Sequence, residues 1–166
     1  MEAYLLDTSA LTPLVNEGHL KHQAARAIID KLGSAPIYVS VIALAEMLYG
    51  FGLYKKFEGS VLPNADGMMS KALGYPCLGI SNHTASAYAE LKSTLAKHYL
   101  PTPKKEFRKR HVEDWVDQFT GKTLAVDDND IWVCAQAREM NFVVVAGDKM
   151  ERIRKGDPLL KFLLIA

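Results

Sequence analysis

Short apolar runs alternate along the chain with longer segments in which apolar residues recur in a helical pattern. The short runs are residues 3–6, 36–39, 77–80, 142–146 and 159–165. They show little alternation with polar residues, as expected for strands of a parallel sheet that is covered on both faces. The longer segments, which predict helices, are residues 20–32, 41–53, 68–73, 82–98 and 130–140. The pattern therefore predicts an α/β fold with a mostly parallel central sheet.

Serine residues mark the starts of two predicted helices. Ser40 and Ser81 each stand directly before a helix, where a serine side chain can accept a hydrogen bond from a free backbone N–H. The helix after the first strand leaves two possibilities open. Either Ser9 caps it, or Thr12 caps a helix that begins at Pro13, since a proline there lacks only an N–H that would be unpaired anyway.

Residues 99–123 break the pattern, because they contain two prolines, a basic cluster and Gly121. We predict that this segment is a basic insertion or loop rather than a core element. The rest of the chain shows no second unit, so we expect a single domain that spans residues 1–166.

Composition narrows the class of protein. The 166 residues carry a net charge of only +1, so any attraction to nucleic acid must come from a local cluster. The two cysteines, Cys77 and Cys134, indicate free thiols in a reducing compartment rather than a disulfide framework. The first residues lack the features of a signal peptide, and the apolar stretch at 39–49 is interrupted by Ser40 and Glu46. We expect a cytoplasmic protein without a membrane contact.

Four acidic residues stand out because of where they occur. Asp7 and Asp148 each follow an apolar strand directly, and the carboxyl ends of parallel strands form the edge where ligands bind. Glu46 is the only charged residue in the helix predicted at 41–53, and a lone carboxylate on an apolar helix is costly to bury. Asp130 begins a helix, where the helix dipole favours a negative charge.

Each of these residues also has an interpretation without chemistry. Asp7 or Asp130 could simply cap a helix. Asp148 could be a turn residue beside Gly147. Glu46 could form a buried ion pair with a lysine or arginine. The recurrence of four such residues at strand ends and helix starts favours a shared site instead.

Carboxylates that share a site repel one another, so they need a cation or else hold protons at raised pKa values. Ligand sets made only of oxygen select Mg²⁺ or Mn²⁺ over zinc, and the histidines and cysteines do not show zinc-site spacing. Mg²⁺ held by a few carboxylates keeps several waters, which suits metal-assisted phosphoryl chemistry.

Four segments of the chain together resemble a known family. They are YLLDTSAL at residues 4–11, SVIALAEMLYG at 40–50, NDIWVCAQA at 129–137 and VVAGD at 144–148. They resemble the motifs of PIN domains, in particular those of the VapC-type toxins of prokaryotic toxin–antitoxin pairs. The motifs occur in the family's order and span nearly the whole chain.

This resemblance implies a three-layer α/β/α sandwich and a Mg²⁺- or Mn²⁺-dependent endoribonuclease. The residues that it assigns to the metal and catalytic site are Asp7, Glu46, Asp130 and Asp148, with Asp7, Asp130 and Asp148 as metal ligands and with help from the hydroxyl of Thr8 or Ser9. It further implies a homodimer, and a cognate antitoxin that covers the site.

The sequence departs from the family pattern in two places. The family often has serine or threonine two residues before the last acid, whereas this chain has Ala146, so we expect a missing hydroxyl contact there. Residues 99–123 are longer than in compact members. In addition, Asp127 and Asp128 crowd Asp130, and either could share or replace its role, although the motif register favours Asp130.

A basic cluster lies within residues 104–111. Its cations are Lys104, Lys105, Arg108, Lys109 and Arg110. Beside an acidic metal site they would suit an RNA backbone, with Phe107 or Trp115 available for stacking. The alternative is a solvated loop. We expect Trp115 and Trp132 to act mainly in packing.

Two rival functions remain open at this stage. A phosphatase with an aspartyl nucleophile would use Asp7, but that class has a second aspartate two residues later, where this chain has Ser9. A non-catalytic cation-binding or phospho-receiver-like module would use the acids only to hold a cation.

Overall fold

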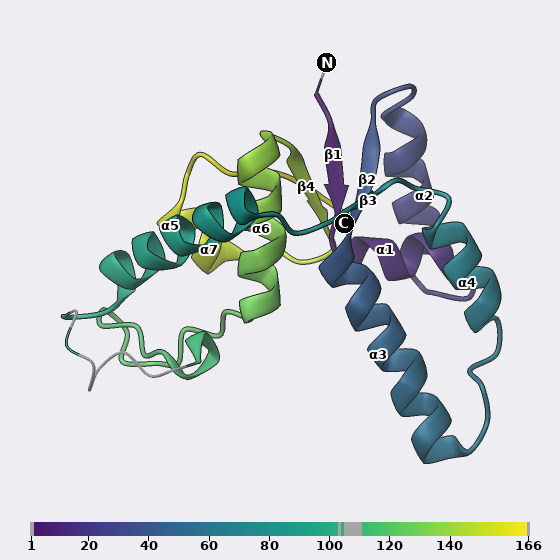
Figure 1. Cartoon of the computed structure of the whole chain (residues 1–166), viewed down its shortest axis with the longest axis horizontal. Coiled ribbons are helices and arrows are strands. Elements are labelled where there is room, and N and C mark those ends of the chain that lie inside the picture. Colours follow the sequence, from purple (N-terminus) through teal and green to yellow (C-terminus); the bar gives the residue numbers. More distant parts are fainter. Residues whose placement is uncertain (1, 103, 105–110, 166) are drawn as a thin grey trace.

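The centre of the molecule is a sheet of five parallel strands, seen in a computed structural model that describes residues 2–102, 104 and 111–165 (Figure 1). The strands are β1 (Tyr4–Leu6), β2 (Ile37–Ser40), β3 (Cys77–Leu78), β4 (Val143–Ala146) and β5 (Lys161–Leu164), in the order β3-β2-β1-β4-β5. All four strand pairs are parallel. The first strand therefore lies in the middle, with β4 as its neighbour despite the long separation in sequence.

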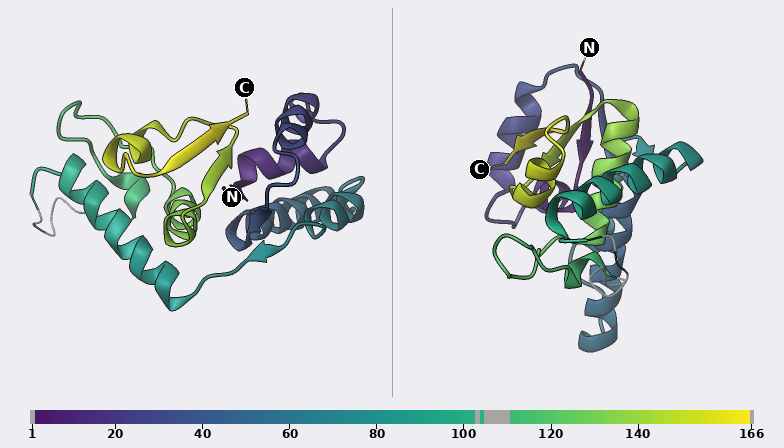
Figure 2. Two further views of the ribbon diagram at one scale, coloured as in Figure 1. Left: turned by 90° about the horizontal axis from the view of Figure 1, so that it is seen from above. Right: turned by 90° about the vertical axis from the view of Figure 1, so that its left-hand side faces the viewer.

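Helices cover both faces of this sheet and give the three-layer α/β/α sandwich. They are α1 (Thr8–Val15), α2 (His22–Lys31), α3 (Val41–Glu58), α4 (Ala65–Ala72), α5 (Asn82–Tyr99), the 3-10 turn η1 (Val112–Asp114), α6 (Asp128–Met140) and α7 (Glu151–Gly156). From above, α1 and α2 lie on one side and α5, α6 and α7 on the other (Figure 2).

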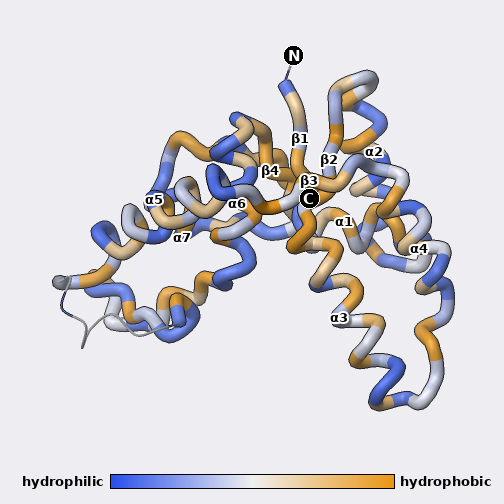
Figure 3. Tube along the Cα trace, in the orientation of Figure 1, coloured by the Kyte–Doolittle hydropathy of each residue, from blue (hydrophilic) through white to orange (hydrophobic). Residues whose placement is uncertain are grey.

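Side chains that alternate along β1 separate the two layers of the core. Leu5 packs with α5, α6 and α7, whereas Leu6 packs with α1 and α3, because successive residues of a strand point to opposite faces. Both leucines are fully buried. Hydrophobic residues run along β4 as well (Figure 3), which explains why these strands lack an alternating polar pattern.

The predicted helix starts at Ser40 and Ser81 are confirmed. The Ser40 side chain accepts a hydrogen bond from the Ile42 N–H, and Ser81 forms a capping box with Thr84. The helix expected at 41–53 is longer than predicted, since α3 continues to Glu58, and Figure 1 shows it extending away from the sheet. The short helix expected at 68–73 lies a little earlier, as α4.

Two features were missed or misjudged. The pattern did not predict α7, whose six residues include four with charged side chains. Residues 99–123 contain no long helix or strand in their described part, as expected of a loop. They are nevertheless more than an excursion, because Val112 and Trp115 are buried in the core beside α5. Irregular backbone places these apolar side chains inward, and a periodic pattern does not reveal such packing.

The cysteines are free, with Cys77 exposed and Cys134 buried. Among the described residues, none of the helices combines the length and the apolar character needed to cross a membrane.

A buried glutamine connects the edge strand β3 to the centre of the fold. Gln136 on α6 is fully buried and accepts a hydrogen bond from the Ser40 hydroxyl at 2.6 Å. Its amide Nε2 donates to the carbonyls of Leu78, at 2.8 Å, and Gly79, at 3.0 Å. The side chain therefore joins the end of β2, the helix α6 and the two-residue strand β3.

We expect Gln136→Leu to lower the free energy of unfolding by about 1–3 kcal/mol, because buried polar partners lose their hydrogen bonds. Urea denaturation of the purified protein measures the change. The matched control is Gln23→Leu at an exposed position of α2, which should change stability by less than about 0.5 kcal/mol. Equal effects of the two substitutions would contradict the structural role of Gln136.

Candidate active site

Asp7 lies directly after β1, at the carboxyl edge of the sheet, and it caps α1. Its Oδ2 accepts hydrogen bonds from the Ser9 N–H at 3.1 Å and from the Ser9 hydroxyl at 2.6 Å. The prediction that Ser9 or Thr12 caps this helix is therefore wrong. The helix begins at the residue after Asp7, with no intervening loop, so the junction residue itself is the cap. Asp7 is only 3% exposed.

Ser9 ties the start of α1 to the end of β4. Its Oγ donates to Asp7 and accepts a hydrogen bond from the Gly147 N–H at 2.8 Å. The two loops pass so closely that a Cβ added to Gly147 would lie 2.5 Å from the Ser9 carbonyl oxygen. This packing holds Asp7 next to the loop that carries Asp148.

Ala146, where the family often has serine or threonine, faces the core. Ala146 is fully buried in the core and supplies no hydroxyl. One residue later, the backbone N–H of Gly147 is satisfied by the Ser9 hydroxyl.

Glu46 lies on α3 near the start of that helix and is half-buried. It accepts hydrogen bonds from the Thr8 hydroxyl and, at 2.8 Å, from the Asn129 side-chain amide. In the described part of the chain it has no ion pair with a lysine or arginine, so the salt-bridge alternative is wrong there. Asn129 was not predicted as a site residue. Its position beside Asp130 at the start of a helix was the only available signal.

Three closely spaced acids near the start of α6 have different surroundings. Asp127 is the N-cap and accepts from the Asn129 N–H at 2.8 Å. Asp128 pairs with the Lys92 ammonium at 2.6 Å and accepts from the Tyr88 hydroxyl at 2.7 Å. Asp130 instead lines a pocket with the other predicted acids. The geometry thus sets Asp130 apart from its two neighbours.

The predicted residues meet in one open pocket of about 530 Å³ at the carboxyl edge of the sheet. Every member of the predicted set lines it, namely Asp7, Thr8, Ser9, Glu46, Asp130 and Asp148. Sequence reasoning missed Thr12, His19 and Lys21, which line the same pocket from α1 and the turn that follows it. No pattern in that short polar turn pointed to the site.

Burial and mutual repulsion raise the pKa of two acids in this pocket, Asp130 and Asp7. The pKa of Asp130 rises from its ordinary value of 3.8 to about 8, first because of burial and then because of the neighbouring charges of Asp7, Asp148, Asp127 and Glu46. Burial also raises the pKa of Asp7, against the opposing effect of the hydrogen bonds from Ser9. The pocket therefore favours a bound cation or a proton.

The donor set fits a hydrated hard cation better than a closed protein cage. Among the described residues, no three His, Cys, Asp or Glu side chains are gathered closely enough to enclose a metal ion. The pocket is open, however, and its acidic donors are all oxygens. Mg²⁺ retains several waters and is commonly held by one or two carboxylates, so loosely gathered acids suit it.

The predicted RNA-binding cluster is only partly placed. Lys104 is exposed, whereas Lys105, Arg108, Lys109 and Arg110 lie outside the described residues. Trp115 is 3% exposed, so it is not available for stacking on a base, and its predicted packing role is confirmed.

The model of the PIN domain family matches residues 4–156 of the chain. A search of the curated proteins gave no match.

Solved structures with the same fold include VapBC2 of Rickettsia felis, crystallised with a promoter DNA fragment. The chain is 20% identical to it, with a TM-score of 0.68 and 99% of each chain covered. The DNA-bound VapBC of Salmonella typhimurium is 15% identical, with a TM-score of 0.62 and full coverage of both chains. Mycobacterium tuberculosis VapC20, described as a sarcin–ricin loop cleaving toxin, is 13% identical, with a TM-score of 0.51 and coverage of 87% of this chain and 89% of that one.

The close contact at Gly147 leads to a first prediction for this site. We expect Gly147→Ala to lower the free energy of unfolding and to disturb the pocket, because the new Cβ would collide with the Ser9 backbone. Thermal unfolding measures the loss. The control is Gly50→Ala within α3, where a Cβ meets nothing within 4 Å and should be neutral or slightly stabilising. A Gly147→Ala variant as stable as wild type would contradict the contact.

The raised pKa of Asp130 gives a second prediction. In metal-free protein its carboxyl binds a proton more tightly when folded than when unfolded. The resulting stability is fully present below a pH of about 4, the pKa of an unfolded aspartate, and is lost as the pH rises to about 8. The free energy of unfolding in EDTA should therefore fall over this range.

Asp130→Asn should flatten this pH dependence, since asparagine does not titrate. Asp66→Asn, at an exposed position of α4, should leave it unchanged. Denaturant titrations at several pH values provide the measurement, and the same slope in wild type and Asp130→Asn would show that Asp130 is not the titrating group.

Proposed function

This chain belongs to the PIN domain family, and we propose that it is a metal-dependent endoribonuclease, the toxin of a type II toxin–antitoxin pair. The observation that carries the proposal is the pocket in which Asp7, Glu46, Asp130 and Asp148 meet. Four acids at one edge of a parallel sheet suit a hard divalent cation, and such cations assist hydrolysis of phosphodiesters.

In this proposal Asp7, Asp130 and Asp148 hold the cation, which is Mg²⁺ or Mn²⁺. When bound, the cation would neutralise charge on phosphate oxygens and lower the pKa of a water molecule. Ser9 fixes the orientation of the Asp7 carboxylate through two hydrogen bonds to one oxygen. The Asp7 residue held in this way lines the pocket.

The hydrogen bonds that orient Glu46 support a role for it as general base in this reaction. Thr8 and Asn129 both donate hydrogen bonds to its carboxylate, and these contacts fix its direction within the pocket. We assign to Glu46 the acceptance of a proton from the attacking water. Thr8 thus acts as a positioning residue rather than a nucleophile.

The proposal includes two protein partners. Structures with this fold include VapBC complexes, which supports a cognate antitoxin that covers the site. A large exposed apolar face on α3 supports contacts with other chains, including a second copy in a homodimer. Its residues are Tyr49, Leu53 and Phe57, which are spaced four apart along the helix, and Phe57 is 81% exposed.

RNA is the proposed substrate because of the site chemistry and because a protein of the same fold is described as cleaving an RNA loop. The exposed Lys104 adds a cation for the RNA backbone, and the neighbouring Lys105, Arg108, Lys109 and Arg110 remain a prediction.

We expect the purified protein to cleave RNA with Mg²⁺ or Mn²⁺ and to stop in EDTA. Asp7→Asn should reduce the rate by roughly a hundredfold or more. Asparagine is also a good N-cap, so the start of α1 should survive the change. Asp66→Asn, on the surface of α4, is the matched control and should keep full activity.

Undiminished cleavage in EDTA, or by Asp7→Asn, would refute the metal-site proposal. Trapping of a phosphoaspartate at Asp7 would favour the phosphatase alternative. Tight Mg²⁺ binding without turnover of any RNA would favour the cation-binding module.

A further inference from the structure

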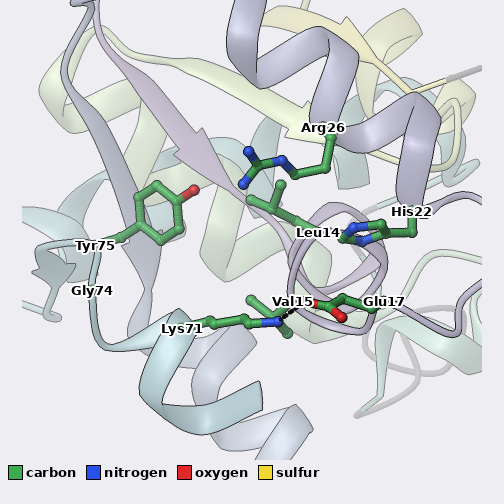
Figure 4. Close-up of a pocket in the computed structure, with 8 residues that line it drawn as sticks. All are labelled: Leu14, Val15, Glu17, His22, Arg26, Lys71, Gly74 and Tyr75. Carbon is green, nitrogen blue, oxygen red and sulfur yellow. Dashed lines mark hydrogen bonds and ion pairs between the residues drawn. The ribbon is translucent and has the colours of Figure 1, made fainter. Parts of the chain in front are cut away.

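A second pocket, also of about 530 Å³, lies at the end of α1 that is farther from Asp7. It is enclosed by α1, α2, α4 and the turn that leads into β3 (Figure 4). Its floor is apolar, because Leu14 and Val15 are almost fully buried. Its remaining walls are polar and include the side chains of Arg26, Lys71 and Tyr75.

The cations of this second pocket are only lightly engaged. Arg26 has a single ion pair among the described residues, to Asp30 at 3.8 Å, and both side chains are more than half exposed. Most of the N–H donors of its guanidinium are therefore available to a ligand. Lys71 pairs with Glu17 at 2.6 Å on the pocket rim. Figure 4 shows the Arg26 and Tyr75 side chains extending into the same open space.

The Tyr75 ring is half-buried, and within the described part of the chain its hydroxyl makes no hydrogen bond. Burial raises its pKa, so the hydroxyl is neutral and can donate at neutral pH. An aromatic ring above an apolar floor, with a guanidinium nearby, suits a planar base that carries a phosphate.

The second pocket is connected to the carboxylate pocket through the turn between α1 and α2. His19 and Lys21 line the carboxylate pocket, whereas Glu17 and His22 line the second one. The His22 ring nitrogen Nδ1 lies 2.8 Å from the carbonyl oxygen of Pro13, a residue that lines the carboxylate pocket. One short turn thus separates the two pockets.

Lys21 supplies a cation in the turn between the two pockets. Of the described residues that line the carboxylate pocket, it is the only lysine or arginine. It is exposed and has no ion pair within the described part of the chain. A phosphate that approaches four acids needs such a positive neighbour.

We propose that single-stranded RNA, cut in the carboxylate pocket, passes Lys21 and places an adjacent nucleotide in the second pocket. There a base stacks on Tyr75, and a backbone phosphate contacts Arg26 and Lys71. This inference rests on the proposed function and names a subsite for the same substrate. An acidic peptide would also meet the cations, but the Tyr75 ring and the single short turn between this pocket and the carboxylate pocket favour RNA.

The test compares two RNAs, one just long enough to be cut and one extended so that it spans both pockets. For the extended RNA, Arg26→Ala and Tyr75→Leu should each raise KM by about five- to a hundredfold while kcat stays unchanged. Loss of the Arg26 contact should also reduce the slope of log affinity against log salt by about 0.7. Both variants should cut the minimal RNA as well as the wild-type protein does.

Lys31→Ala is the control, because Lys31 is an exposed cation on the same helix and lines neither pocket. Glu17→Gln provides a test in the opposite direction. It removes the acid that holds Lys71, so binding of the extended RNA should tighten. Mere damage to the fold would not produce a gain.

Equal effects of Arg26→Ala on both RNAs, or no effect on either, would overturn the inference. So would an unchanged affinity for RNA together with weaker inhibition by an antitoxin, since the pocket would then serve a protein. If wild type cuts neither RNA, the proposed function fails. In that case, fluorescence anisotropy measures the affinity of the extended RNA for wild type and for Arg26→Ala in EDTA. A weaker affinity of Arg26→Ala would support RNA binding in the second pocket independently of cleavage.

Discussion

Repulsion between carboxylates is the constraint on which the rest of this structure depends. Asp7, Glu46, Asp130 and Asp148 lie around one pocket, and burial together with the proximity of the other acids raises the pKa of Asp130 to about 8. Such a group is unfavourable without a proton or a cation. The surrounding fold must therefore supply rigidity, which it does with a central parallel sheet and short connections at its carboxyl edge. Gathering the acids costs folding free energy locally, and the packing of both helical layers offsets that cost.

Hydrogen bonds from hydroxyl and amide groups give two of the acids, Asp7 and Glu46, a direction. Ser9 holds Asp7, while Thr8 and Asn129 hold Glu46. Two of these donors belong to the first turn of α1, so the helix that Asp7 caps also organises the acids around it. The same helix extends to the second pocket, so one element contributes residues to both pockets.

Sequence reasoning succeeded where the signal was local. An apolar strand followed by an acid located Asp7 and Asp148, and serine before a helical pattern located Ser40 and Ser81. The cap of α1 was misjudged because the decision is tertiary: the Ser9 hydroxyl is occupied by Gly147, far away in sequence. The site roles of the acids remain predictions, although their convergence in one pocket is now established. His19 and Lys21 had no pattern of their own, since only the folding of the α1–α2 turn brings them to the pocket.

The Ser9–Gly147 hydrogen bond spans 138 positions of the chain, and it has a consequence for biosynthesis. A growing chain that has not reached Gly147 lacks both the partner of the Ser9 hydroxyl and Asp148, the last acid of the pocket. The carboxylate pocket therefore cannot be assembled until Gly147 and Asp148 have been translated. A site built in this order is incomplete while the preceding residues are being made.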